Sequence, residues 1–93
     1  MLVHVKIYYF SVFGKGSFAL DLDADATVLD ALSALNDKFG EAFEREVGRE
    51  LMGAFESYFN VFLNGRHLDL PSQSAQGLKG GDKLIILRPV SGG

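Results

Sequence analysis

The chain has 93 residues, of which 47% are hydrophobic and 23% charged. This length predicts one domain and excludes a multi-domain enzyme, and this composition predicts a globular protein and excludes a disordered chain. Because it contains no cysteine, a disulfide framework, a thiolate metal site and a cysteine nucleophile are excluded. The net charge of −3 is uneven, with ten acidic and three basic residues in 21–56, and the six basic residues elsewhere are too scattered to predict nucleic-acid binding.

Two strands are predicted at the start of the chain. Residues 3–9 place Val3, Val5, Ile7 and Tyr9 at alternate positions, a period of two that is typical of a strand with one apolar face. A second alternating run covers 18–22, and Gly14-Lys15-Gly16 lies between the two. We interpret these glycines as a hairpin turn rather than a dinucleotide-binding loop, because a strand and not a helix follows them.

A helix is predicted over residues 28–39. Thr27 with Asp30 three residues later approximates a capping box, in which aspartate replaces the usual glutamate. Gly40 predicts the end of this helix. Its apolar residues recur at helical spacing and give it one face toward the sheet, namely Val28, Leu32, Leu35 and Phe39.

Residues 41–58 carry conflicting signals. An i, i+4 apolar stripe favours a helix, but Gly48 and Gly53 each lower helix stability by about 1 kcal/mol. We expect a short helix near 41–47, followed by irregular chain.

The remaining elements are strands. Val61–Leu63 leads into Asn64-Gly65, a tight-turn signal, and a short returning strand is expected at Leu68–Leu70 before a polar loop over 71–77. Leu84–Leu87 is a continuous apolar run that suits a central strand. The element order predicts an α+β fold, with one mixed sheet wrapped around a main helix and with the first and last strands parallel at its centre.

No internal cluster of side chains predicts an active site or a metal site. His4 and His67 are sixty-three positions apart and have no carboxylates at a metal-site spacing. Asp21, Asp23 and Asp25 lack the glutamate that closes a calcium loop, so we interpret them as a solvated strand edge. We therefore expect a protein that is not itself an enzyme and binds no cofactor.

The last two residues, Gly92-Gly93, are the strongest functional signal. Two residues without Cβ atoms form a thin end that can enter a narrow active site, and a carboxylate there reacts once it has been activated, for instance by a nucleotide. Residues 89–93 span at most about 17 Å when extended, enough to reach into another protein. We expect a domain over 1–88 and a flexible tail over 89–93.

The stretch from Leu78 to Gly93 carries a Leu-x-x-Gly-Asp-x-hydrophobic pattern and a Pro-Val-x-Gly-Gly ending. Both resemble the ubiquitin-like sulfur carriers, namely the small subunit of molybdopterin synthase and the thiamine-pathway sulfur carrier. The similarity also covers the opening strand, the Thr27-Val28 helix start and the turn at 64–65. The resemblance implies a β-grasp (ubiquitin-like) fold.

The resemblance also implies a function. A ubiquitin-activating-type adenylyltransferase would use ATP to adenylate Gly93, and sulfur transfer would convert it to a thiocarboxylate. Gly92 would give clearance in the active site, with Pro89, Val90 and Ser91 as the rest of the tail. The sulfur acceptor would be an enzyme such as the large subunit of molybdopterin synthase, since the length favours that carrier type. Two alternatives remain open: a protein modifier joined to lysines through Gly93, and a ubiquitin-like interaction module with an idle end.

Strand parity predicts a docking surface. If the odd-numbered residues of the first strand face the helix, an apolar group faces outward on three neighbouring strands. We expect this patch to dock the activating and acceptor enzymes, unless residues 41–58 fold over it. No segment has the length or order of a membrane span or secretion signal, so a cytoplasmic protein without a membrane partner is expected. The predicted docking residues are Tyr8, Phe10, Phe62, Ile85 and Leu87.

Overall fold

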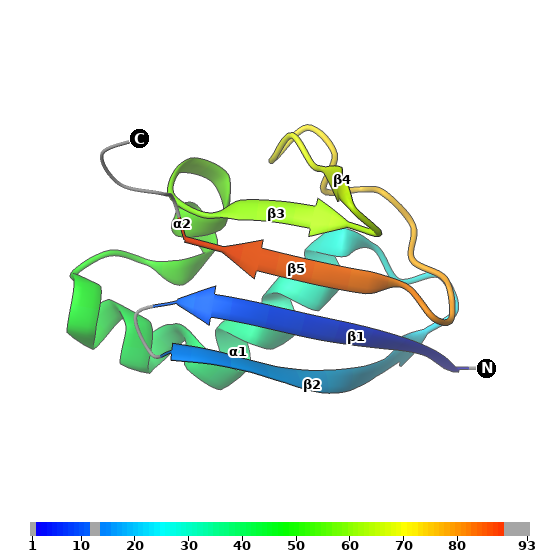
Figure 1. Ribbon diagram of the computed structural model, residues 1–93, viewed down its shortest axis with the longest axis horizontal. Helices are drawn as coiled ribbons and strands as arrows, with labels where there is room; N and C mark the ends of the chain where they lie inside the picture. The colour runs from blue at the N-terminus through cyan, green and yellow to red at the C-terminus, as the bar shows by residue number, and fades with distance from the viewer. Residues whose placement is uncertain (1, 12–13, 89–93) are drawn as a thin grey trace.

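A computed structural model describes residues 2–11 and 14–88, except for the side chains of Phe10 and Ser11. One mixed sheet lies in front of two helices (Figure 1). The elements, in chain order, are β1 (Leu2–Ser11), β2 (Gly14–Asp23), α1 (Val28–Val47), α2 (Leu51–Ser57), β3 (Asn60–Leu63), β4 (Arg66–His67) and β5 (Lys83–Leu87).

The sheet has the strand order β2-β1-β5-β3-β4. β1 and β2 form an antiparallel hairpin whose register runs without interruption from the Leu2–Asp23 pair to the Ser11–Gly14 pair. β5 lies parallel to β1 and antiparallel to β3. The predicted α+β class and the predicted parallel pairing of the first and last strands are therefore confirmed.

The hydrophobic core lies between the helices and one face of the sheet. On β1, Val5 and Ile7 are completely buried, whereas Val3 and Tyr9 are partly buried against the same core. Residues of α2 join this core from the helix side, so residues 41–58 do not cover the other face of the sheet. The alternative in which they cover that face is wrong. The remaining buried strand residues are Val61, Leu63, Leu84 and Ile86.

The N-terminus of α1 is held by its cap and by the loop that precedes β5. The backbone N–H of Thr27 donates a hydrogen bond of 2.8 Å to the Asp30 carboxylate, as the predicted capping box requires. The first N–H groups of a helix lack partners within it. Here Val28 and Leu29 donate to the carbonyl oxygens of Gln76 and Ser74, each over 2.9 Å. The polar loop thereby fixes the helix against the sheet.

The prediction that the helix ends at Gly40 is wrong, because α1 continues to Val47 and ends at Gly48. Gly40 is buried, and a Cβ there would collide with the Asn36 side chain. A glycine inside a helix costs about 1 kcal/mol, but continuing the helix buries Phe43, which contributes about 1.5–3 kcal/mol. Gly48 has a φ of 81°, the left-handed conformation that glycine adopts readily at a helix end.

The prediction of irregular chain after residue 47 is also wrong, since α2 follows at Leu51–Ser57. Leu51, Ala54 and Phe55 of this helix are buried. The apolar stripe therefore continues across the break at Gly48, and packing outweighs the low helix propensity of Gly53.

The turn at Asn64-Gly65 joins β3 to β4. Both residues have positive φ angles, 52° and 85°, as a two-residue hairpin turn requires. The returning strand is Arg66–His67 rather than the predicted Leu68–Leu70. Leu68 is buried, and its N–H donates to the carbonyl oxygen of Val61 in β3. The chain therefore makes one more hydrogen bond to β3 after β4 ends.

Asp82 connects this turn to the start of β5. Its side chain is buried, and it accepts hydrogen bonds from the Asn64 amide at 2.9 Å and from the Lys79 backbone N–H at 2.8 Å. Asn64 in turn accepts the N–H of Lys83 at 2.9 Å. The Gly-Asp pair of the sequence motif therefore has a structural role, which is to set where β5 enters the sheet.

We expect Asp82→Ala to lower the free energy of unfolding by about 1–3 kcal/mol, because the donors from Asn64 and Lys79 lose their acceptor. Urea denaturation followed by circular dichroism measures this value. Asp25→Ala is the matched control, since Asp25 is exposed. Equal stability of the two variants would contradict the role of Asp82.

The alternation along β5 gives a second test. Ile86 is buried in the core, so Ile86→Ala should lower the free energy of unfolding by about 2–5 kcal/mol. Ile85 is half-buried on the other face, and Ile85→Ala should cost only about 1 kcal/mol. Parallel urea titrations compare the two, and similar losses would show that both faces of the sheet are covered.

Candidate docking face and C-terminal tail

The face of the sheet opposite the helices carries a continuous row of side chains across four strands. Tyr8 of β1 pairs with Ile85 of β5, and Ile85 pairs with Phe62 of β3. Phe62 then pairs with His67 of β4. Tyr8, Ile85 and Phe62 are half-buried and are not part of the core, so their side chains form an apolar row on the surface. This outer row brings together three of the predicted docking residues.

His67 was not predicted as part of this face. Its ring lies edge-on to Phe62 with the ring centroids 5.2 Å apart, and its Nε2 is 3.3 Å from the Asn60 side-chain oxygen. The sequence signal was present, since a two-residue turn at 64–65 pairs residue 63 with 66 and residue 62 with 67. The predicted returning strand at 68–70 leaves residue 67 outside the strand, so the pairing of residues 62 and 67 was not predicted.

Leu87 lies on the same face, one step closer to the end of β5. It is half-buried and pairs with Phe10 of β1 and Asn60 of β3. Phe10 belongs to β1 by its backbone, but its side chain lies outside the described part, so its predicted docking role is untested. The apolar face therefore extends from the outer row along β5 to Leu87, next to Arg88.

Positive charge lies on the same face, on the side of the outer row that is opposite to Leu87. Lys6 of β1 pairs with Lys83 of β5, and both residues are exposed. The Lys6 ammonium lies 5.9 Å from the centroid of the Tyr8 ring. Most acidic residues of 21–56 lie on the helices, whereas Asp21 and Asp23 lie on β2, on the far side of β1 from β5. A partner surface that combines apolar and acidic groups would complement this face.

The tail residues Pro89, Val90, Ser91, Gly92 and Gly93 lie outside the described residues. Arg88 is the last residue that the structure describes, and it is exposed directly after β5. The tail is therefore connected to the end of the strand that carries Ile85 and Leu87.

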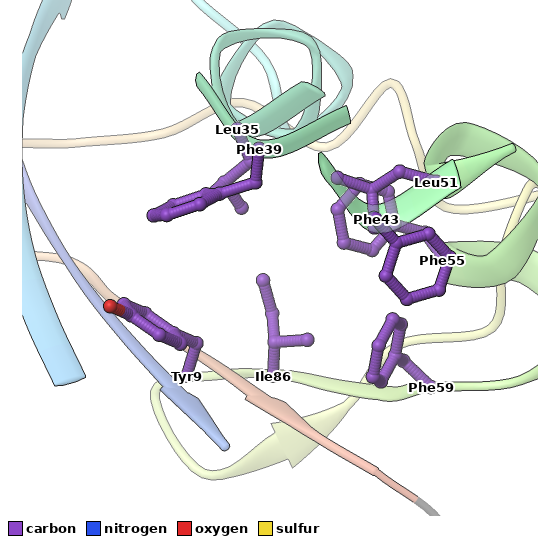
Figure 2. A pocket seen from close by; sticks show the side chains of 8 residues that line it. All are labelled: Tyr9, Leu35, Phe39, Phe43, Leu51, Phe55, Phe59 and Ile86. Atoms are coloured by element: carbon purple, nitrogen blue, oxygen red, sulfur yellow. The ribbon is translucent and has the colours of Figure 1, made fainter. Parts of the chain in front are cut away.

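A small apolar cavity lies between the helices and the ends of β1 and β5. Figure 2 shows Tyr9 and Ile86 on the sheet side of this cavity, with Phe39 and Phe55 among the helix residues across from them. Its volume of about 30 Å³ is close to that of one or two water-sized groups, and its lining is almost entirely apolar. Apart from the Tyr9 hydroxyl its lining side chains are apolar, so it offers little that would orient a polar substrate.

Ionisable side chains gather beside the turn at 64–65, where Arg66, His67, Lys79 and Asp82 line a pocket of about 250 Å³. His4 pairs with Asp21 on the exposed face of the hairpin. Within residues 2–11 and 14–88, no three histidine or acidic side chains are close enough to hold a metal ion. Among the described helices, none is both long enough and apolar enough to cross a membrane.

Comparison with known proteins identifies relatives along nearly the whole chain. The profile of the ThiS family matches residues 9–93. Small archaeal modifier protein 1 of Haloferax volcanii is 37% identical over 82 residues, which are 88% of this chain and 87% of that protein.

Solved structures agree with the fold described above. The crystal structure of small archaeal modifier protein 1 from Haloferax volcanii superposes with a TM-score of 0.68 and 28% identity, covering 97% of this chain and 99% of that one. A putative molybdopterin converting factor subunit 1 from Pyrococcus furiosus also gives 0.68 and 28%, covering 95% and 99%. The fold is a ubiquitin-like β-grasp, and the chain belongs to the ThiS family.

Proposed function

We propose that this protein is a sulfur carrier whose Gly93 carboxylate is adenylated by a partner enzyme and converted to a thiocarboxylate. The observation that supports this most directly is the apolar face made by the outer row and Leu87, which ends five residues before Gly92. The family match through residue 93 supports the same assignment of the tail.

The proposed chemistry takes place at the carbonyl carbon of Gly93. A carboxylate oxygen attacks the α-phosphorus of ATP, and pyrophosphate leaves, which gives a mixed anhydride with AMP. A hydrosulfide ion, or a donor of sulfur at the same oxidation state, then attacks the carbonyl carbon. AMP leaves, one proton is released, and the thiocarboxylate is formed. The partner supplies the catalytic groups and ATP, while this chain supplies the acyl group and a tail narrow enough to enter the active site.

The folded domain would contribute binding energy and position. Tyr8, Ile85 and Phe62 offer apolar area on rigid strands, and aromatic side chains at such sites are common anchors in interfaces. Lys6 and Lys83 at the border would select a partner with acidic groups beside its apolar surface. Both the adenylyltransferase and the sulfur acceptor would dock here in turn, because the same tail must enter both active sites. Similarity to the putative molybdopterin converting factor subunit favours a molybdopterin synthase large subunit as acceptor.

A second candidate function is protein modification. The 37% identity to a protein named as a modifier favours it. In this reaction a lysine amine attacks the carbonyl carbon of adenylated Gly93, AMP leaves, and an isopeptide bond forms. Activation and docking are the same in both functions, so they differ only in the nucleophile.

Intact mass spectrometry of the protein purified from its native cells separates these functions. We expect a population in which one oxygen of the C-terminal carboxylate is replaced by sulfur, together with a chain that ends at Gly93. Deleting Gly93 should abolish this species. Isopeptide-linked Gly-Gly remnants on other proteins, without any thiocarboxylate, would instead establish the modifier function.

Phe62→Asp tests the docking face, because it places a charge within the outer row, directly beside Ile85. We expect the affinity for the adenylyltransferase to fall at least about tenfold, as for the loss of a central interface anchor, while the domain stays folded. Leu29→Asp is the matched control, since Leu29 is 46% exposed on α1 and lies away from this face. Binding is measured by isothermal titration calorimetry, and an unchanged affinity for Phe62→Asp would remove the outer row from the interface.

A further inference from the structure

The outer edge of β2 is a long strand edge with no neighbour in the described part of the chain. β2 is ten residues long and stands at one end of the strand order. At the other end stands β4, which has only two residues. A strand edge presents backbone N–H and C=O groups that can pair with another strand.

The backbone groups that face this edge can be identified from the register. The Lys6 N–H donates to the carbonyl oxygen of Asp82, and the His4 carbonyl oxygen accepts from the Gly81 N–H. The backbone N–H and C=O groups of even-numbered β1 residues are therefore directed toward β5. Odd-numbered residues of β1 therefore bond to β2, and their partners there have even numbers. The edge of β2 is consequently lined by the backbone groups of Lys15, Ser17, Ala19 and Asp21, with the N–H of Asp23.

This edge lacks several of the usual protections against pairing, although Lys15, Asp21 and Asp23 are exposed charged residues along it. β2 contains no proline, and its register with β1 has no bulge. None of its core-facing residues carries a charge, although inward charges are a common way to block an edge. Phe18, Leu20 and Leu22 face the core, yet they are only half-buried. A further strand at this edge would cover the apolar surface that they leave exposed.

The sequence of the edge is complementary to itself. In an antiparallel pair of two β2 strands with Ala19 opposite Ala19, each Lys15 lies opposite the Asp23 of the other copy. Ser17 then lies opposite Asp21, whose carboxylate accepts hydrogen bonds. On the core side, Phe18 lies opposite Leu20. Opposite charges and paired apolar side chains at facing positions both stabilise antiparallel strands.

We propose that two copies of this chain associate through their β2 edges, antiparallel and centred on Ala19, into one continuous sheet. The two-fold axis passes beside Ala19, so the interface is the same patch on both copies. β1 separates this edge from β5 and β3, so the pairing leaves the outer row and the end of β5 uncovered. The dimer would therefore present two Gly-Gly ends to partner enzymes. The proposed dimer does not depend on whether Gly93 carries sulfur.

Sedimentation velocity of the full chain over a range of concentrations tests the dimer. We expect the wild type to change from monomer to dimer as its concentration rises. Lys15→Glu and Asp23→Lys each place like charges opposite one another at two positions, and each should weaken the dimer about tenfold. Circular dichroism of each variant checks that the domain is folded.

Mixing the two variants provides the decisive control. In a mixed pair, the glutamate introduced by Lys15→Glu in one copy would face the lysine introduced by Asp23→Lys in the other. The unchanged Lys15 and Asp23 would face each other as in the wild type, so the heterodimer should regain wild-type affinity. The double variant Lys15→Glu/Asp23→Lys should also regain it as a homodimer.

Two kinds of result would overturn the proposal. A wild type that remains monomeric at its highest soluble concentration would do so, and would leave an extended peptide of another protein as the occupant of the edge. A dimer unaffected by the single substitutions, or single variants that do not rescue each other, would also overturn it.

Discussion

Burial of only one face of the sheet is the constraint on which the structure depends. Side chains on a strand alternate between two faces, so the helices on one side force every second residue of β1, β3 and β5 into the core. The residues between them are directed to the opposite surface. Ile86 and Ile85 illustrate this, because the first is buried in the core and the second pairs with Tyr8 and Phe62 on the outer row. Core and docking face therefore arise from the same alternation.

Position along the strands matters as much as the choice of face. Asp82 holds the start of β5 through Asn64 and Lys79, and this fixes which residues of β5 lie opposite those of β1 and β3. A shift by one residue would bring Ile86 to the surface and Ile85 into the core. The buried carboxylate lies at the start of β5, and Arg88 follows the other end of the strand.

Period-two patterns made the sheet, its centre and most of the outer row predictable from the sequence. Helix ends were less predictable, because Gly40 has a low local helix propensity while Phe43 and Phe55 gain burial only once both helices pack on the sheet. His67 was missed for a related reason, since two residues of β4 are too short for a periodic signal. The role proposed for Gly93 rests on its chemistry and on family resemblance, and no packing pattern in the sequence bears on it.

In the proposed function, the folded domain delivers an activatable carboxylate to a partner enzyme. The most direct measurement compares ATP–pyrophosphate exchange by the adenylyltransferase with two substrates at equal concentration, the full chain and a synthetic peptide of residues 88–93. We expect rapid exchange with the full chain and little above background with the peptide, because the peptide has the Gly-Gly end without the outer row. Equal rates with both substrates, or no exchange with the full chain, would contradict it.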